Sequence, residues 1–372
     1  MSIPPQQVVG DDPSDPLGIL SQTIAGRFVA VRYLGSTSVT HIYRAIHQLM
    51  DQPCFLKICH VDPEAEDGIP ISLRKEAQAA AKANHAAVLR LFDAGVKGDY
   101  AYLAQEWSDG PNLRAIMSRG SDISVPDLLD LALQLLDSVC ALHRLGIVLR
   151  AFDPERILVP SVDGKPRLRL FDLSRIAWIG DRMADSAADS KHPTGFKIRS
   201  TRYMAPEEIK DQPAEPRSDL YSFGVLLCEM ITGEYPYPPR GKGPTAYVVS
   251  HLKDDVRPLV FEGRAEIPDD LPSIVRRLLM KDPEQRFETA EAARRALEDI
   301  IVPDLMRLNT PNDRHVLEAW RKRVRVGLRS TRSLMIGSAF SPSSQEPPIP
   351  SASSADDPPP LGLLSEDPDL GL

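Results

Sequence analysis

Several charged residues stand in apolar or loop-like surroundings, and these are the residues that could do chemistry. Lys57 interrupts the apolar run PCFLKIC, where burial of an ammonium group without a partner would be costly. Asp172 follows the alternating run LRLF, and Asp153 and Arg156 stand in LRAFDPERIL. Carboxylates can take up protons, and guanidinium groups bind phosphate oxygens well. The plainer interpretations are a snorkelling lysine, a turn-capping Asp172, and an Arg156 paired with a neighbouring acid.

The elements that must position these residues change in character along the chain. Short β-rich runs dominate residues 27–112, with one Ala-rich helical stretch, SLRKEAQAAAKAN, among them. From about residue 125 to residue 301 the pattern is helical, and Ser124 with Pro126 marks the first helix N-terminus. Residues 1–22 and 336–372 are rich in Pro and polar or acidic residues, which predicts disordered tails.

Composition excludes several classes of protein. The 44 Lys and Arg against 52 Asp and Glu give a net charge of −8, which leaves no overall footprint for nucleic acid. The four cysteines form no CxxC pair, so neither a zinc site nor a disulfide framework is indicated. The N-terminus lacks the pattern of a secretory signal, and no window approaches the roughly 18 apolar residues of a membrane span. We therefore expect a cytoplasmic protein with no transmembrane segment.

Between residues 24 and 303, a series of short motifs follows one another along the chain. The motifs are YLGSTSVTHIY, CFLK, RKEAQAAAKANH, AYLAQEWSDG, LRAFDPERIL, LRLFDLS, STRYMAPEE, RSDLYSFGVLLCEMITG and DPEQRF. By these residues the chain resembles the eukaryotic-like Ser/Thr protein kinase family of bacterial type. The resemblance implies an α+β, two-lobed domain over residues 23–303, with a β-rich N-lobe at 23–107 and a mostly helical C-lobe at 112–303.

The resemblance also implies a nucleotide site. Lys57 would hold the α- and β-phosphates of ATP and pair with Glu76 on the following helix, and Asp172 would be the metal ligand. The implied ATP-binding residues are Gly35, Lys57, Glu76, Glu106, Trp107 and Asp172. An alternative register that pairs Phe171 with the family's phenylalanine would place Leu170 at the metal ligand and abolish metal binding. The strand alternation of LRLF favours Asp172.

The glycine-rich loop departs from the family pattern. Its three glycine positions are Gly35, Thr37 and Thr40 in this chain. Glycine lets backbone amides approach phosphate closely, whereas β-branched side chains would crowd that approach. A phosphate-binding loop and a plain β-turn both remain open as interpretations.

The catalytic loop departs furthest from the family. Ala151 stands where the resemblance implies an aspartate as general base, a role worth roughly 10²- to 10⁴-fold in rate. Arg156 replaces the asparagine that helps to hold the second Mg²⁺, and a cation there should repel metal. Mg²⁺ binding is therefore expected to be weakened. Asp153 as a substitute base, with Arg156 clamping phosphate oxygens, would rescue activity.

Three further family residues are structural by resemblance. Glu207 should form a buried ion pair with Arg286, and Asp219 should accept hydrogen bonds from the backbone around Arg150. Beyond the domain, residues 304–335 form a basic amphipathic helical segment. Its core at 312–332 could dock on an acidic partner, a membrane surface or the protein's own acidic lobe, or pack as a C-terminal helix.

Two functions from different classes follow. The first is a pseudokinase, a kinase fold without phosphotransfer that works as a regulatory or scaffolding module and can still hold ATP. Its partners would be other proteins, such as signalling proteins or substrates of a related kinase. The second is an ATP-dependent Ser/Thr kinase with an atypical site built on Lys57, Asp172, Asp153 and Arg156. A purely structural scaffold that binds no nucleotide differs from the first only in ligand binding. Loss of the base at Ala151 together with the change at Arg156 favours the first.

Overall fold

The structure is a computed structural model, and it describes residues 15–37, 40–118, 123–150, 152–181, 198–238, 244–259 and 267–307. Ala151, most of the basic segment at 304–335 and the tail at 336–372 lie outside the described residues. Up to Glu298 the described residues belong to one compact unit. Residues 299–307, the end of the last helix, belong to a second unit that runs from Asp299 to Pro359.

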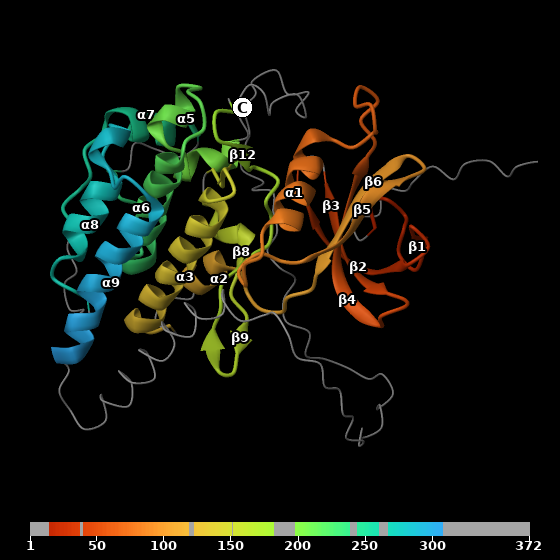
Figure 1. The fold of residues 1–372 in the computed structure, drawn as a ribbon, viewed down its shortest axis with the longest axis horizontal. Coiled ribbons are helices and arrows are strands. Elements are labelled where there is room, and N and C mark those ends of the chain that lie inside the picture. The colour runs from red at the N-terminus through yellow and green to blue at the C-terminus, as the bar shows by residue number, and fades with distance from the viewer. Residues whose placement is uncertain are drawn as a thin grey trace, which may run out of the picture. The chain divides into compact units, whose positions relative to one another are not determined.

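One antiparallel sheet forms the N-lobe, with strand order β1-β2-β3-β4-β6-β5. The strands are β1 (Thr23–Ile24), β2 (Phe28–Ser36), β3 (His41–His47), β4 (Gln52–His60), β5 (Leu91–Lys97) and β6 (Tyr100–Glu106). Helix α1 (Ile71–Lys82) lies beside this sheet, as Figure 1 shows in red and orange. In the register of β4 with β6, Lys57 pairs with Leu103, and Cys54 pairs with Glu106 at the other end. The central strand therefore places Lys57 in the middle of the sheet.

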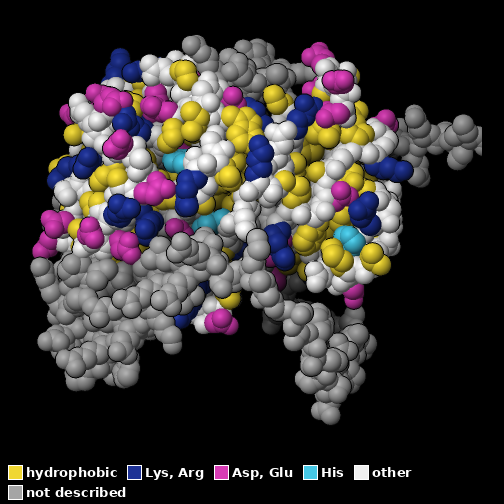
Figure 2. Space-filling model, in the orientation of Figure 1, with side chains coloured by type: hydrophobic (Ala, Val, Ile, Leu, Met, Phe, Trp, Pro, Cys, Tyr) yellow, Lys and Arg dark blue, Asp and Glu magenta, His cyan; other side chains and the backbone are white. Residues whose placement is uncertain are grey.

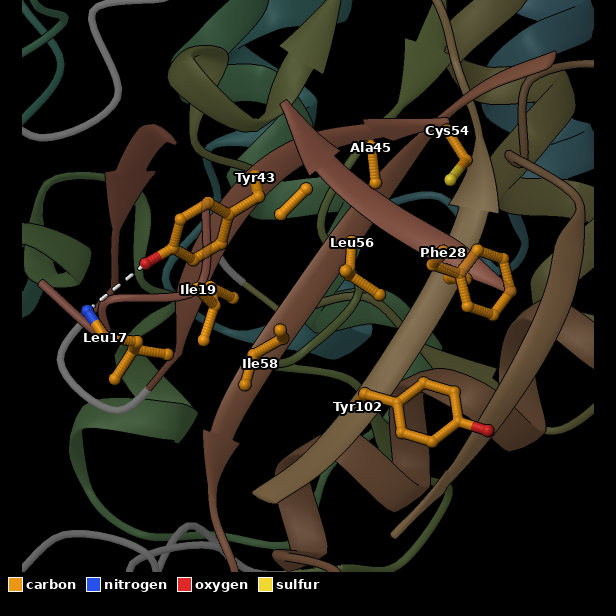
Figure 3. Close-up of a cluster of buried hydrophobic side chains, with 11 residues drawn as sticks. Leu17, Ile19, Phe28, Tyr43, Ala45, Cys54, Leu56, Ile58 and Tyr102 are labelled. Atoms are coloured by element: carbon orange, nitrogen blue, oxygen red, sulfur yellow. Dashed lines mark hydrogen bonds between the residues drawn. The ribbon is translucent and has the colours of Figure 1, made fainter. Parts of the chain in front are cut away.

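Successive side chains along each strand point to opposite faces of the sheet, and apolar clusters bury both faces. On one face lies the cluster drawn in Figure 3, in which Phe28, Tyr43, Leu56 and Ile58 are almost fully buried. On the other face Phe55 joins a second apolar cluster, which includes residues of the C-lobe. The fold of the N-lobe thus presents alternate residues of β4 to two different surroundings.

The N-lobe begins earlier in the chain than the sequence analysis predicted. Residues 15–22, assigned there to a disordered tail, contribute Leu17 and Ile19 to the cluster of Figure 3. The backbone N–H of Leu17 donates to the Tyr43 hydroxyl, which in turn donates to Asp15. Two apolar residues in a polar stretch give little periodic signal, so only the packing identifies them as core.

The C-lobe is mostly helical. Its helices are α2 (Leu113–Ser118), α3 (Val125–His143), α5 (Pro206–Ile209), α6 (Pro216–Thr232), α7 (Pro244–Lys253), α8 (Leu271–Leu278) and α9 (Ala290–Arg307), with 3₁₀ helices η1 (Pro154–Arg156), η3 (Ile198–Tyr203) and η4 (Pro283–Gln285). Short strand pairs complete it: β7 (Ile147–Val148) with β12 (Ala177–Trp178), β8 (Ile157–Leu158) with β11 (Arg169–Leu170), and β9 (Ser161–Val162) with β10 (Lys165–Pro166).

Helices α3 and α6 form the centre of the C-lobe (Figure 1). The Ser124 side chain caps α3 by accepting a hydrogen bond from the Asp127 backbone, as predicted. Helix α6 is buried nearly all round and ends at Gly233, whose φ of 74° suits glycine. At Gly224 a Cβ would come within 2.7 Å of the Leu278 Cβ, so this glycine lets α6 and α8 pack closely. These helices form a rigid base for the loops that join them.

Charged side chains of both signs are interspersed on the face drawn in Figure 2, where they alternate with hydrophobic side chains. Among the described helices, none is long and apolar enough to cross a membrane.

Candidate functional site

Lys57 and Glu76 form the buried ion pair that the resemblance implied. The Lys57 Nζ lies 2.5 Å from a Glu76 carboxylate oxygen, and the two side chains are 2% and 1% exposed. The strand alternation of β4 points Lys57 away from the cluster of Figure 3, and α1 presents Glu76 to it. Burial raises the pKa of Glu76, and the charge of Lys57 opposes that effect. The lysine is therefore partnered, and it does not snorkel to solvent.

The same pair reaches the segment that follows β11. Lys57 Nζ donates to the Phe171 carbonyl at 2.9 Å, and it lies 3.8 Å from the Asp172 carboxylate. The Glu76 carboxylate also accepts from the Leu173 backbone N–H at 3.1 Å. Leu170 lies one residue earlier than Phe171, buried in β11 with its N–H bonded to the Ala87 carbonyl. The structure thus places Asp172 beside Lys57, in agreement with the register favoured by the sequence analysis.

Asp172 makes its shortest ion pair with an arginine. Arg156 Nη1 lies 2.6 Å from the Asp172 carboxylate, and it also donates to the Ser174 hydroxyl at 3.1 Å. Burial by itself would raise the pKa of Asp172. The charges of Arg156 and Lys57, with hydrogen bonds from Ser174, outweigh burial and hold the pKa well below its usual range. Asp172 is therefore an ionised carboxylate whose charge two internal cations already compensate.

Asp153 is engaged in local structure. Its side chain caps η1 by accepting the Glu155 backbone N–H at 3.0 Å, and it lies 3.9 Å from Arg156 Nε. The guanidinium of Arg156 thus stands between two carboxylates. The plainer interpretation paired Arg156 with a neighbouring acid, and Asp153 is in range, but the closer partner is Asp172. The cap on η1 gives Asp153 a structural role that is independent of proton transfer.

The surroundings of this ion pair carry additional positive charge. Arg175 lines the same small hollow as Arg156 and Asp172, with Phe152 as an apolar neighbour. Burial lowers the pKa of Arg175 to about 9, and the nearby charge of Arg156 contributes. Its Nη1 has no hydrogen-bond partner among the described residues. Sequence reasoning missed Arg175, although an arginine directly after LRLFDLS was a visible signal.

Mg²⁺ does not fit the donor set of this site. Mg²⁺ needs near-octahedral oxygen coordination and is repelled by adjacent cations. Within the described ranges, no three His, Cys, Asp or Glu side chains are grouped so that they could hold a metal ion. The carboxylate of Asp172 is instead in contact with Arg156.

Thr37 and Thr40, at two of the glycine positions of the family's loop, are hydrogen-bonded to each other. Gly35 lies inside β2, paired with Ile42, and its φ of 146° is one that glycine favours. The Thr37 N–H donates to the Thr40 carbonyl, and the Thr40 N–H donates to the Thr37 hydroxyl. Both backbone amides are thus used within the turn, which favours the β-turn interpretation over a phosphate-binding loop.

The segment between the lobes is also engaged internally. Glu106 pairs with Arg90 at 3.3 Å and lies 4.0 Å from Arg169. The indole N–H of Trp107 donates to Asp109, and its ring packs on Phe55 with the centroids 4.3 Å apart. Both side chains implied to bind ATP therefore contact the protein itself.

The three structural residues occupy the places that the resemblance implied. Arg286 binds Glu207 with two hydrogen bonds of 2.6 and 2.9 Å, and both side chains are buried. Asp219 accepts the backbone N–H groups of Leu149 and Arg150, each at 2.8 Å. His143 also contacts Asp219, at 2.7 Å. These contacts fix the start of the catalytic loop, which leads to Ala151, outside the described residues.

Comparison with known proteins agrees with this architecture. The protein kinase domain family matches residues 28–297, so the chain belongs to the protein kinase family. A probable serine/threonine-protein kinase of Streptomyces coelicolor is 28% identical over 73% of this chain and 39% of its own length. PrkC of Bacillus subtilis is 25% identical over 73% of the chain and 40% of its own length. PknL of Mycobacterium bovis is 29% identical over 77% of the chain and 68% of its own length.

The predicted two-lobed α+β fold and the resemblance to eukaryotic-like Ser/Thr kinases are confirmed. The aligned part of the chain spans about 40% of the first two relatives. Similarity to these relatives shows the family, whereas phosphotransfer by this chain depends on the residues of its own site.

Proposed function

We propose that this protein is a pseudokinase, a kinase-fold protein that lacks phosphotransfer and acts by binding other proteins. The observation that carries the proposal is the contact of 2.6 Å between Arg156 and Asp172. The guanidinium of Arg156 contacts the carboxylate of Asp172, which would otherwise bind the metal of a kinase. Metal entry would require breaking a buried, charge-assisted hydrogen bond, which is unfavourable unless the arginine finds another partner.

Two further features support the proposal. Ala151, at the place of the family's general base, carries no group that can accept a proton. The turn at Thr37 and Thr40 uses its own amides and offers neither to a phosphate. The base, the metal site and the phosphate-binding loop are each altered, so no single compensating residue would restore the reaction.

An active kinase remains the alternative, and one observation favours it. The Lys57–Glu76 pair is intact, and Leu173 is bonded to the same glutamate, as in a site kept ready for nucleotide. In that case Asp153 would serve as base and Arg156 would bind phosphate oxygens. Asp153 would then have to leave its capping position on η1.

Phosphotransfer from radiolabelled ATP to a generic protein substrate tests the two functions. We expect the wild-type chain to transfer no more label than its Lys57→Met variant, which serves as the matched control. Transfer that is present in the wild type and lost in both Lys57→Met and Asp153→Ala would establish the active kinase. Transfer lost in Lys57→Met alone would also contradict the pseudokinase, and it would exclude Asp153 as the base.

The partners are proposed to be proteins, because the family acts on or with proteins and no other ligand chemistry is evident in the described surface. The basic stretch at 312–332 is proposed as one docking segment, on the basis of its sequence alone.

A further inference from the structure

Phe55 occupies the face of β4 that also carries Lys57. The two residues are separated by one position, so both side chains point to the same side of the strand. The intervening Leu56, with Cys54 and Ile58, faces the opposite cluster shown in Figure 3. Phe55 thus projects toward the space between the lobes, on the side of Lys57 that leads to Trp107.

A column of side chains fills that space. The Lys57 Nζ lies 4.6 Å from the centroid of the Phe171 ring. The Phe171 and Phe55 ring centroids are 4.5 Å apart, and those of Phe55 and Trp107 are 4.3 Å apart. The Arg44 guanidinium lies 5.2 Å from the centroid of the Trp107 ring. These contacts run without a break from the implied phosphate-binding lysine to the segment that joins the lobes.

Both lobes contribute to the cluster around Phe55. Leu34 comes from β2 and Ile42 from β3, while Leu158 comes from β8 and Phe171 follows β11. Phe55 is fully buried and Phe171 is 1% exposed, so the rings are packed as a protein interior. The cluster therefore joins the lobes by direct apolar contact.

We propose that the Phe55 ring takes the place of a nucleotide base, so that the cleft is closed by its own side chains and binds no adenine nucleotide. Any planar ligand placed between Trp107 and Lys57 would have to expel a buried ring that contacts both Trp107 and Phe171. At the other end of the cleft, Arg156 already compensates the charge of Asp172. The protein thus supplies internally an aromatic ring and a cation, the two features that magnesium nucleotide would bring.

This inference deepens the proposed function and rests on it, because it concerns the same cleft. The two can nevertheless fail separately. Nucleotide binding without phosphotransfer would overturn the closed cleft and leave the pseudokinase standing, whereas phosphotransfer would overturn both.

The test compares Phe55→Ala with the wild type in direct titrations with adenosine and with ADP, followed by calorimetry and by thermal unfolding. We expect no saturable binding of either ligand by the wild type in the millimolar range. In Phe55→Ala both ligands should bind saturably, with an affinity at least about tenfold tighter than the millimolar limit that the wild-type titration sets. Adenosine carries no phosphate, so its binding reports on the base position alone.

The matched control is Phe28→Ala, which removes an equally buried phenylalanine from the opposite face of the same sheet. It should lose stability without gaining any affinity for adenosine. Phe55→Val is a second, milder variant that replaces the aromatic ring with a smaller, β-branched strand former and should also gain binding. Saturable binding of adenosine or ADP by the wild type would overturn the inference. So would folded Phe55→Ala or Phe55→Val protein that gains none.

Discussion

Two arginine–carboxylate pairs in this molecule have the same chemistry but different surroundings, one fully buried and the other partly buried. Arg286 and Glu207 join α5 to the segment after η4, and Arg156 and Asp172 join the catalytic loop to the segment after β11. The shortest distance in each pair is 2.6 Å. The first pair lies where the fold needs a permanent contact. The second involves the carboxylate that the resemblance implies as metal ligand, so under the proposed function this ion pair takes the place of the metal.

The other contacts of each pair determine how much stability is lost when one partner is removed. Arg286 is surrounded by backbone carbonyls of Met280, Lys281 and Arg217, all of which it satisfies. Asp172 has Lys57 and Ser174 beside it as well as Arg156. Loss of one partner should therefore be severe in the first pair and moderate in the second.

The largest expected effect is that of Arg286→Ala. It would leave Glu207 buried without its cation and three carbonyls without their donor, so we expect a loss of about 3–5 kcal/mol in unfolding free energy. Urea unfolding followed by circular dichroism measures it. The matched control is Arg217→Ala, whose partner Glu284 is largely exposed, with an expected loss below about 1 kcal/mol. Equal losses in the two variants would contradict the structural role of the Glu207–Arg286 pair.

Glu208 provides an intermediate case, because it is buried next to Glu207 but has a more distant cation. Its carboxylate accepts the Ala205 N–H and lies 3.8 Å from Arg150 Nε. Burial raises the pKa of Glu208 to about 7. Because the pKa of Glu208 is higher in the folded than in the unfolded state, its protonated carboxyl stabilises the fold at low pH. This stabilisation is lost as the pH rises from about 4.5 through 7.

Glu208→Gln should therefore raise the unfolding free energy at pH 8 by roughly 1–3 kcal/mol relative to wild type, with little change at pH 4. Urea unfolding across this pH range measures the difference. The neighbouring Glu207→Gln variant, in which the ion pair with Arg286 is lost, should instead be destabilised at both pH values. A Glu208→Gln variant that keeps the wild-type pH dependence would show that this carboxyl is ionised in the fold at neutral pH.

The smallest expected effect is that of Arg156→Asn. Because Lys57 and Ser174 still contact Asp172, the loss at pH 7 should be only about 1–2 kcal/mol. The pKa of Asp172 is lowered in the fold, so its contribution is present above about pH 4 and is lost as the pH falls further. The variant should therefore lose less of its stability on acidification than the wild type, and Arg156→Lys, which keeps a cation, should behave more like wild type. If the wild type, Arg156→Asn and Arg156→Lys all lost the same unfolding free energy on acidification, coupling between Arg156 and Asp172 would be contradicted.

Much of the architecture could be predicted because several positions act through local rules or short spacing. The Ser124 cap, the β-rich runs at 27–112 and the helical stretch SLRKEAQAAAKAN are local patterns, and each is present in the structure. The pairs Lys57–Glu76 and Glu207–Arg286 could be predicted only through the resemblance, because their partners are far apart in sequence and spacing alone gives no contact. Their presence in the structure follows from the shared fold.

Other features could not be predicted from any local pattern. The sequence analysis treated Arg156 as a cation that repels metal or clamps phosphate, or as an arginine paired with a neighbouring acid. Its closest partner is Asp172, which is 16 positions away in sequence and is brought close by the pairing of β8 with β11. Residues 15–22 appeared to be tail, yet Leu17 and Ile19 complete the N-lobe core. The contacts of Glu106 with Arg90, and of Trp107 with Phe55, likewise join positions that no local pattern connects.

The sequence by itself determined the kinase fold, because its motifs and hydrophobic periodicities are spread over the whole domain and agree with one another. It also determined that alanine, which has no group to accept a proton, stands at position 151, where the resemblance implies the family's base. Only the tertiary structure decided which side chains meet between the two lobes. Phe55, Trp107 and Phe171 come from three separate segments, and the apolar cluster exists only because the two lobes bring these side chains within contact distance.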